Sequence, residues 1–328
     1  MGDVLIDGQR DRDRSIHLVA TAGPGQGRGH LSRAITVAAA LRERGIPVSL
    51  ELDAGGLDAG LEAVVSGLGV RRTTRPPDDA VVVVDMPDVS AASGRAPADR
   101  LVVFDDRGAF NGRAAIVIQP SLPTWEGTGS VDRVLAGFDY APVAASYRAL
   151  RDAADRTGSH GEPGRREVVI CFGGSDPFDV TRRIARAVTA GVGWRTWIVV
   201  GPDYRPEVED LADYVLRDPP DLPERLAACD LAVIGAGTMK FEVACLGRPA
   251  LLLAAADDQL PVGPAFAASG AARWLGDGRS IDPERVERAV ASLISDPTEL
   301  AAIGSRARAV IDGQGADRIA EALAVLAG

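Results

Sequence analysis

The stretch IHLVATAGPGQGRGHLSRAITVAAALRERG, residues 16–45, sets the fold class of this chain. Its apolar first part, residues 16–22, predicts a buried strand, and the glycines after it predict a turn. The second part predicts a helix ending at Gly45, because apolar residues recur there at helical spacing, at Leu31, Ile35, Ala38 and Leu41. A strand followed by a helix in this way is typical of a βα unit.

The same alternation continues along the chain. Further apolar runs predict strands of one parallel sheet at residues 46–52, 81–85, 101–106 and 115–119. Others predict strands of a second sheet at residues 168–172, 194–201, 230–237 and 249–255. Ligands of open α/β sheets bind at the carboxyl ends of the strands, so the turns after the strands are where a site is expected.

A length of 328 residues favours two domains. The polar, glycine-rich residues 152–166 are typical of a linker. We therefore expect an α/β fold of two Rossmann-like domains that face each other across a cleft, at residues 15–151 and 167–328. A flexible leader at residues 1–14 precedes them, and the last helix is free to pack back on the first domain.

Composition narrows the class of protein. The chain has 36 basic and 46 acidic residues and a net charge of −10, which disfavours nonspecific binding to nucleic acid. Its apolar runs are far shorter than the roughly 20 residues that cross a bilayer, so no transmembrane segment is expected. The N-terminus lacks the apolar core of a secretory signal. Single cysteines in apolar segments predict core residues in a reducing compartment, so we expect a cytoplasmic protein.

The first candidate site is the turn GQGRGH, residues 25–30. Its glycines let the backbone approach a ligand closely, and the start of a helix offers free N–H groups to an anion. His30 stands where a dinucleotide fingerprint has its third glycine, and no Gly-Lys-Ser/Thr follows, so neither common nucleotide motif matches. His30 is therefore a candidate general base at the edge of the sheet. The alternative is a glycine turn with an incidental histidine, and His17 and His160 are interpreted as structural or solvated.

Two more glycine turns follow predicted strands. Gly173 and Gly174, with the hydroxyl of Ser175, can form a nest that binds an anion. The alternative is a plain turn in which Asp176 caps the next helix. The turn at residues 235–238 presents Gly237 and Thr238 at a helix start, which suits a diphosphate.

Acidic residues near these turns are further candidates. Glu242 lies one helical turn after Thr238 and could accept both hydroxyls of a ribose. The alternative pairs it with a basic neighbour such as Lys240, the only lysine of the chain. The acidic pairs at residues 105–106 and 257–258 are of a kind that can bind Mg²⁺. Such pairs more often cap helices or face solvent, so we assign no metal and no cofactor.

Six motifs in the chain resemble one known family. They are GRGHLSRAITVAAALRERG, GFDYA, FGGSDP, IGAGTMKFEVACLGRP, DDQ and DGQGADRIAEAL, and they span nearly the whole chain from residue 16. They resemble the UDP-sugar hydrolase of pseudaminic acid biosynthesis and the related spore-coat polysaccharide proteins, which belong to the GT-B glycosyltransferase superfamily. The resemblance implies a GT-B fold, with a nucleotide diphosphate sugar, expected to be UDP-linked, held mainly by the C-terminal domain.

The resemblance also implies roles for residues. His30 matches the catalytic base of the family, and Asp85 matches an aspartate that the hydrolases carry. The phosphates, ribose and sugar of the donor are assigned to a larger set, consisting of Gly27, Gly29, Gly173, Gly174, Ser175, Gly237, Thr238, Glu242 and Gln259. Within this set Glu242 is the ribose-binding acid, and Gln259 lies near the sugar.

One departure separates the chain from these hydrolases. They carry Asp-His-Tyr where this chain has Asp85, Met86 and Pro87, so polar groups that could orient a water are missing. We therefore expect a metal-independent glycosyltransferase that breaks the anomeric C–O bond of the donor and passes the sugar to an acceptor hydroxyl of a sugar or natural product. Hydrolysis of the donor is the alternative, and a noncatalytic nucleotide-sugar-binding subunit is a third possibility.

Overall fold

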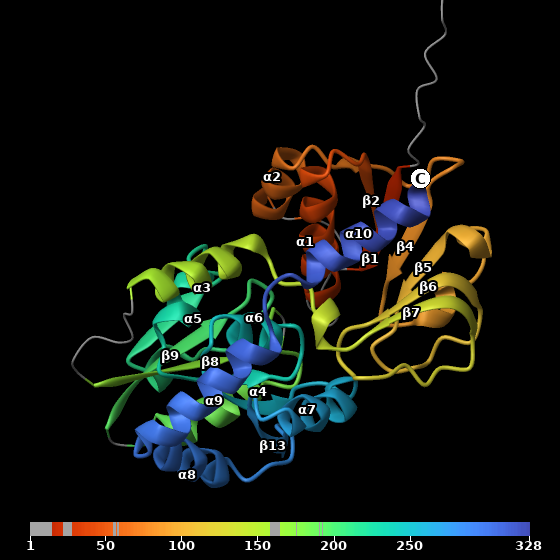
Figure 1. Ribbon diagram of the computed structural model, residues 1–328. Helices are drawn as coiled ribbons and strands as arrows, with labels where there is room; N and C mark the ends of the chain where they lie inside the picture. Colours follow the sequence, from red (N-terminus) through yellow and green to blue (C-terminus); the bar gives the residue numbers. More distant parts are fainter. Residues whose placement is uncertain are drawn as a thin grey trace, which may run out of the picture.

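The computed structural model describes residues 15–21, 28–54, 57, 59–157, 165–174, 176–189, 191 and 193–328. They form two α/β domains, each built on a parallel sheet, as the sequence predicts (Figure 1). The expected leader and residues 158–164 of the expected linker lie outside the described residues.

The N-terminal sheet has seven parallel strands in the order β3-β2-β1-β4-β5-β6-β7. They are β1 (Ile16–Thr21), β2 (Val48–Ala54), β3 (Arg71–Arg72), β4 (Val81–Asp85), β5 (Leu101–Phe104), β6 (Arg113–Gln119) and β7 (Ser130–Ala136). The strand order reverses between β1 and β4, which is the point where open α/β sheets bind their ligands.

The C-terminal sheet has six parallel strands in the order β10-β9-β8-β11-β12-β13. They are β8 (Arg166–Cys171), β9 (Trp194–Val200), β10 (Tyr214–Arg217), β11 (Leu231–Gly235), β12 (Ala250–Ala254) and β13 (Arg273–Asp277). Its order reverses between β8 and β11. All nine strands predicted from apolar runs are present, and the four additional ones are the edge strands β3, β7, β10 and β13.

Helices connect the strands within each domain. The N-terminal domain has α1 (Gly29–Glu43) and α2 (Ala59–Gly67), with short 3₁₀ turns η1 (Val89–Ala92), η2 (Ala98–Arg100) and η3 (Phe138–Tyr140). The C-terminal domain has α4 (Val180–Val188), η4 (Glu209–Leu211), α5 (Leu222–Ala228), α6 (Met239–Cys245), α7 (Gln259–Ala268), α8 (Pro283–Ile294) and α9 (Pro297–Val310). The starts of α8 and α9 follow a common rule, because each has a capping aspartate followed by a proline, at Asp282 and Asp296.

Two further helices, α3 (Ala145–Thr157) and α10 (Gly315–Ala327), pack on the domain opposite to the one that precedes them in the chain (Figure 1). The C-terminal core takes in Val143 and Tyr147, so α3 lies with α5 and α6. The chain thus crosses between domains before α3, whereas the sequence placed the boundary at residue 151. Helix α10 returns to the N-terminal domain and packs on α1.

Both faces of each sheet are covered by apolar contacts. One face of the N-terminal sheet packs under α1 and α10, through residues such as Leu18, Leu31 and Leu323. Its other face packs against η1 and the adjoining loops. The C-terminal sheet lies between α4 and α8 on one side and α3, α5 and α6 on the other. Strands buried on both faces read as continuous apolar runs, which is why the sequence revealed them.

The three cysteines, Cys171, Cys229 and Cys245, are buried and free, as the sequence predicts. None of the helices in the described part of the chain combines the length and the apolar character that crossing a membrane requires.

Candidate active site

A cavity of about 420 Å³ lies between the two domains. The start of α1 borders it on the N-terminal side, and the turns after β8, β9, β11 and β12 border it on the C-terminal side. Most of the residues singled out in the sequence line it, namely Gly29, His30, Gly173, Gly174, Gly237, Thr238, Glu242 and Gln259. Gly27 and Ser175 lie outside the described residues. The carboxyl ends of strands from both sheets therefore meet at one cavity.

His30 occupies the first turn of α1, and Asp85 ends the neighbouring strand β4. Strands β1 and β4 are paired, and the start of α1 lies at the end of β4. His30 Nδ1 hydrogen-bonds Asp85 Oδ1 at 2.7 Å. The His30 side chain is 21 % exposed, whereas that of Asp85 is buried. The imidazole is thus held from behind by a buried carboxylate and lies at the cavity wall.

Arg33, one helical turn after His30, is the second partner of Asp85. Its Nε and Nη2 donate to the two carboxylate oxygens at 2.6 and 2.5 Å, and its Nη1 donates to Asp106 Oδ2 at 2.7 Å. The guanidinium also lies 4.5 Å from the centre of the Phe104 ring. Burial opposes ionisation of Asp85, but Arg33 and His30 outweigh it and hold the pKa of Asp85 below its ordinary value. Arg33 itself is buried, and Asp106 and Asp85 raise its pKa.

The acidic pair at residues 105–106 has two separate roles. The buried Asp105 accepts hydrogen bonds from the backbone N–H groups of Ala109 and Phe110 and from Trp125 Nε1. It therefore fixes the loop after β5. Asp106 is the ion-pair partner of Arg33 and lines the cavity.

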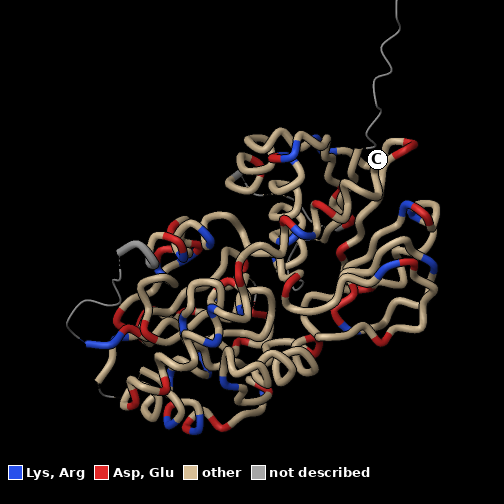
Figure 2. Tube along the Cα trace, viewed as in Figure 1, with Lys and Arg blue, Asp and Glu red and all other residues tan. Residues whose placement is uncertain are grey.

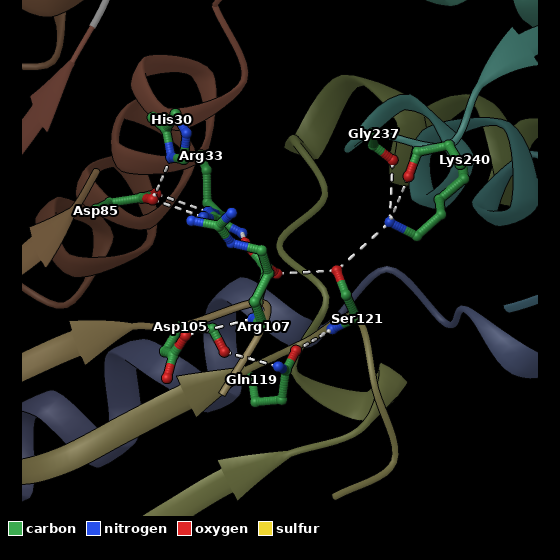
Figure 3. Close-up of polar contacts among 11 residues, drawn as sticks. His30, Arg33, Asp85, Asp105, Arg107, Gln119, Ser121, Gly237 and Lys240 are labelled. Carbon is green, nitrogen blue, oxygen red and sulfur yellow. Dashed lines mark hydrogen bonds and ion pairs between the residues drawn. The ribbon is translucent and has the colours of Figure 1, made fainter. Parts of the chain in front are cut away.

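The network reaches the other domain through Ser121 and Lys240 (Figure 3). Ser121 Oγ donates to Asp106 Oδ1 at 2.9 Å, and Lys240 Nζ lies 3.4 Å from Ser121 Oγ. The same ammonium donates to the carbonyl oxygens of Ala236 and Gly237, both at 3.1 Å. Lys240 is only 2 % exposed, and burial lowers its pKa to about 8, although Asp106 partly offsets this.

The turn after β8 is shaped by close backbone approach. Gly173 has φ of +96°, a conformation that favours glycine. A Cβ on Gly201 would overlap the backbone of Gly174, so the turns after β8 and β9 meet only because this position has no side chain. Asp176 Oδ1 and Oδ2 accept the N–H groups of Val180 and Thr181 at the start of α4. Asp176 therefore caps the start of α4, and the role of Gly173 and Gly174 in binding an anion stays a prediction.

The turn after β11 and the start of α7 lie together. Gln259 Oε1 accepts the N–H of Ala255 at 3.0 Å, which anchors its side chain. A Cβ on Gly237 would lie 3.5 Å from Gln259 Nε2. A Cβ on Gly29, from the opposite domain, would lie 3.7 Å from Thr238 Oγ1. The loops of the two domains thus approach each other at Thr238.

Glu242 is paired with Tyr147 of α3, not with Lys240 as the sequence alternative had it. The Tyr147 hydroxyl hydrogen-bonds the Glu242 carboxylate. Burial raises the pKa of Glu242 to about 7, against the effect of this hydrogen bond, which lowers it. Burial and the carboxylate together also raise the pKa of Tyr147. The helix that crosses between the domains therefore supplies a polar group to the cavity.

The remaining sequence candidates have structural roles or lie outside the site. His17 is buried in β1, with Nδ1 2.9 Å from Ser49 Oγ and Nε2 3.2 Å from Glu51 Oε2, and burial lowers its pKa. This agrees with its interpretation as structural. His160 lies outside the described residues. Asp257 forms an ion pair with Arg279 at 2.7 Å.

Sequence reasoning did not place several polar groups at the cavity and its wall, which are Arg33, Asp106, Ser121, Tyr147 and Lys240. Two of them carry a signal that could have revealed them. Arg33 is a charge within the apolar pattern of α1, and Lys240 is the only lysine and lies within the apolar segment TMKFEVAC. Elsewhere acidic and basic residues are interspersed along the chain in both domains (Figure 2). A buried charge is therefore the exception that marks the site.

No family model matches the chain. The chain is 29 % identical to UDP-N-acetylglucosamine–N-acetylmuramyl-(pentapeptide) pyrophosphoryl-undecaprenol N-acetylglucosamine transferase of Rhodospirillum centenum, over 96 % of each protein. It is 23 % identical to the spore coat polysaccharide biosynthesis protein SpsG of Bacillus subtilis, over 57 % of each.

Solved structures show the same architecture. MurG of Acinetobacter baumannii matches with a TM-score of 0.62 and 16 % identity, over 94 % of this chain and 99 % of that one. The spinosyn rhamnosyltransferase SpnG, complexed with thymidine diphosphate, matches with a TM-score of 0.61 and 19 % identity, over 90 % and 96 %. The chain therefore has the two-domain fold of the GT-B glycosyltransferases. In this fold the cavity lies between two Rossmann-like domains. The finer resemblance to a UDP-sugar hydrolase stays a prediction.

Proposed function

We propose that this GT-B enzyme transfers a sugar from a nucleoside diphosphate donor to an acceptor hydroxyl, with His30 as the general base. The observation that carries the proposal is the 2.7 Å hydrogen bond between His30 and the buried Asp85 at the wall of the interdomain cavity. A carboxylate on one ring nitrogen orients an imidazole and stabilises its protonated form. Asp85 is therefore assigned the role of orienting His30.

The proton and electron balance of the step is simple. His30 Nδ1 is hydrogen-bonded to Asp85, so the other ring nitrogen, Nε2, takes the proton of the acceptor hydroxyl. The acceptor oxygen forms a bond to the anomeric carbon, and the bond from that carbon to the diphosphate oxygen breaks. The electron pair leaves with the nucleoside diphosphate, and the proton stays on His30 until solvent removes it. General base catalysis of this kind contributes roughly 10²–10⁴-fold.

The donor is assigned to the C-terminal wall of the cavity. Gly173, Gly174, Gly237 and Thr238 offer backbone N–H groups and one hydroxyl for the phosphates, with Gly27, Gly29 and Ser175 assigned by resemblance alone. The pair of Glu242 and Tyr147 is suited to ribose hydroxyls, because a carboxylate accepts such hydrogen bonds. Gln259, anchored by Ala255, is assigned to the sugar. Backbone dipoles aimed at the diphosphate would stabilise its charge as it leaves.

UDP is the nucleotide we propose, because the R. centenum relative is named for a UDP-sugar. Thymidine diphosphate, which is bound to SpnG, is the second nucleotide to test. We keep the cytoplasm as the proposed location, since three buried free cysteines suit a reducing compartment.

An acceptor alcohol is favoured over water by the residues after Asp85. Met86 is buried in the N-terminal core, and the carbonyl of Pro87 accepts a hydrogen bond from Arg107. Neither supplies the polar side chain that the hydrolases are expected to use. Hydrolysis of the donor stays the second candidate, and a noncatalytic binder the third.

The test is NMR spectroscopy of the purified protein with a panel of UDP- and dTDP-sugars, first without an acceptor. Line broadening of one donor without turnover supports a transferase and names the donor for a search of acceptors. Release of free sugar and nucleotide from one donor identifies a hydrolase. If no nucleotide or sugar signal broadens at concentrations up to the millimolar range, the proposal is wrong.

A further inference from the structure

A continuous series of polar contacts crosses the cleft from His30 to the loop after β11 (Figure 3). It runs from His30 to Asp85 and Arg33 on the N-terminal side, with contacts of 2.5 to 2.7 Å. Asp106 and Ser121 continue it, and Lys240 carries it to the carbonyl oxygen of Gly237.

The N-terminal part of this series of contacts is rigidly held. The backbone N–H of Ser121 donates to Gln119 Oε1 at 3.0 Å, and Gln119 Nε2 donates to the carbonyl oxygen of Asp105 at 2.6 Å. Ser121 and Arg33 are each at most 5 % exposed. Buried hydrogen bonds polarise their neighbours because little water screens them. A change in hydrogen bonding at one end of this series of contacts is therefore expected to alter the electrostatic environment at the other end.

Lys240 is the member whose partners belong to both domains. Three acceptors share its ammonium, with one hydroxyl from the N-terminal domain and two carbonyl oxygens from the loop after β11. The charged groups that face it are Asp106 and Arg33 from the N-terminal domain and Asp258 from the start of α7. On its own helix it lies 4.0 Å from the centre of the Phe241 ring.

We propose that Lys240 is a positioning residue that couples the Gly237 loop to the orientation of His30 through Ser121 and Asp106. The response of His30 to a bound sugar donor rests on the proposed function, whereas the coupling between Lys240 and His30 does not. When Lys240 withdraws from Asp106, Arg33 is drawn toward Asp106 and away from Asp85. Asp85 then interacts more strongly with His30 and favours the protonated imidazole. The contact of Lys240 across the cleft thus links the protonation of His30 to the presence of a donor at the Gly237 loop.

The composition of the chain makes the test direct, because it has three histidines and one lysine. NMR spectra of protein labelled with ¹³C,¹⁵N-histidine give a His30 signal that is assigned by its loss in His30→Ala. In Lys240→Met we expect the titration midpoint of His30 to rise by at least about 0.3 pH unit. The buried His17 serves as an internal control, and its signal is expected to stay in place. A His30 midpoint equal to that of the unaltered protein would overturn the proposal.

A second variant separates the hydrogen-bonded path from charge acting through space. Ser121→Ala keeps the Lys240 charge but removes the bridging hydroxyl, and we expect the His30 midpoint to rise in it as well. Ser295→Ala, whose hydroxyl bonds only within its own turn at the end of α8, is the matched control. If Lys240→Met moves His30 and Ser121→Ala does not, the coupling through Ser121 is wrong. Ser121→Ala also keeps the test open if Lys240→Met does not fold.

UDP and dTDP are the probes for the donor side. In protein labelled with ¹³C-lysine, we expect added nucleotide to shift the single Lys240 signal and the His30 signal together. In Ser121→Ala we expect the His30 response to fall at least about twofold, while Lys240 still responds. A His30 response of full size would overturn the coupling. Absence of any nucleotide binding would instead contradict the proposed function and leave the comparison of His30 midpoints intact.

Discussion

The backbone of Gly315, the first residue of α10, lies against the carbonyl group of Ala141 with no room for a side chain between them. At this point the segment that leaves the N-terminal domain passes the segment that returns to it. The two crossings are thus packed as one unit between η3 and α10.

Gly315→Ala is expected to destabilise the protein by about 1–3 kcal/mol, because the new methyl group overlaps Ala141 and one of the two crossing segments must move. Thermal and urea unfolding measure the effect. Gly67→Ala, at the end of α2 with open space around it, is the matched control and should not destabilise. Equal stability of the two variants would contradict the tight packing described at the crossing.

His30→Ala is expected to lower turnover roughly 10²–10⁴-fold once the donor and acceptor are known, because it removes the general base. The fold and the binding of nucleotide should be retained, since the donor is assigned to the C-terminal wall. Thr36→Ala, on the next turns of the same helix, should keep full turnover. Near-normal turnover of His30→Ala would remove His30 from the mechanism.

Asp85→Asn is expected to lower the free energy of unfolding by about 3–5 kcal/mol, because Arg33 loses the buried one of its two counter-charges. Asp79→Asn, at an exposed position, is the control and should leave stability unchanged. The pKa of Asp85 is held below its ordinary value, so its stabilising effect is complete above about pH 4 and is lost on further acidification. The difference between variant and unaltered protein should therefore shrink below that pH.

The affinity for UDP is expected to rise with pH through about 7, the pKa to which burial raises Glu242. Only the ionised carboxylate accepts hydrogen bonds with both oxygens, and it predominates above this pH. Calorimetry between pH 5.5 and 8.5 measures the dependence, which Glu242→Gln should abolish.

Tyr147→Phe is expected to move this dependence to higher pH, because the Tyr147 hydroxyl lowers the pKa of Glu242 and its loss leaves burial unopposed. Tyr214→Phe, on the edge strand β10, is the matched control. A UDP affinity that is equal at pH 6 and pH 8 in the unaltered protein would exclude ionised Glu242 as the group that binds ribose.

The interior strands could be predicted from the sequence because a strand covered on both faces must be apolar throughout. The valines of β4 and the leucines of β12 are examples. The four edge strands were not predicted because part of their surface faces solvent and their sequences are therefore not continuous apolar runs. In β7, Leu135 is buried, whereas most of the strand is exposed. The position of α3 escaped as well, because Tyr147 is buried by residues far away in sequence.

The candidate site was predictable where a local pattern marks it. His30, Gly173 and Gly237 follow glycine-rich turns at strand ends, and the cavity brings them together. Arg33 and Lys240 were not predicted because their partners are 52 and 119 residues distant. No local spacing encodes such a pair, and only the sheet order brings the two ends into contact.

The packing of α10 on α1 has a consequence for synthesis on the ribosome. The N-terminal core takes in Ile319, Ala320 and Leu323, so this domain cannot complete its core until α10 has been synthesised. The C-terminal domain, contained between the two crossings, can fold earlier. We expect the nascent chain to leave the part of this face that α10 covers exposed until α10 is made, a surface on which a chaperone would act.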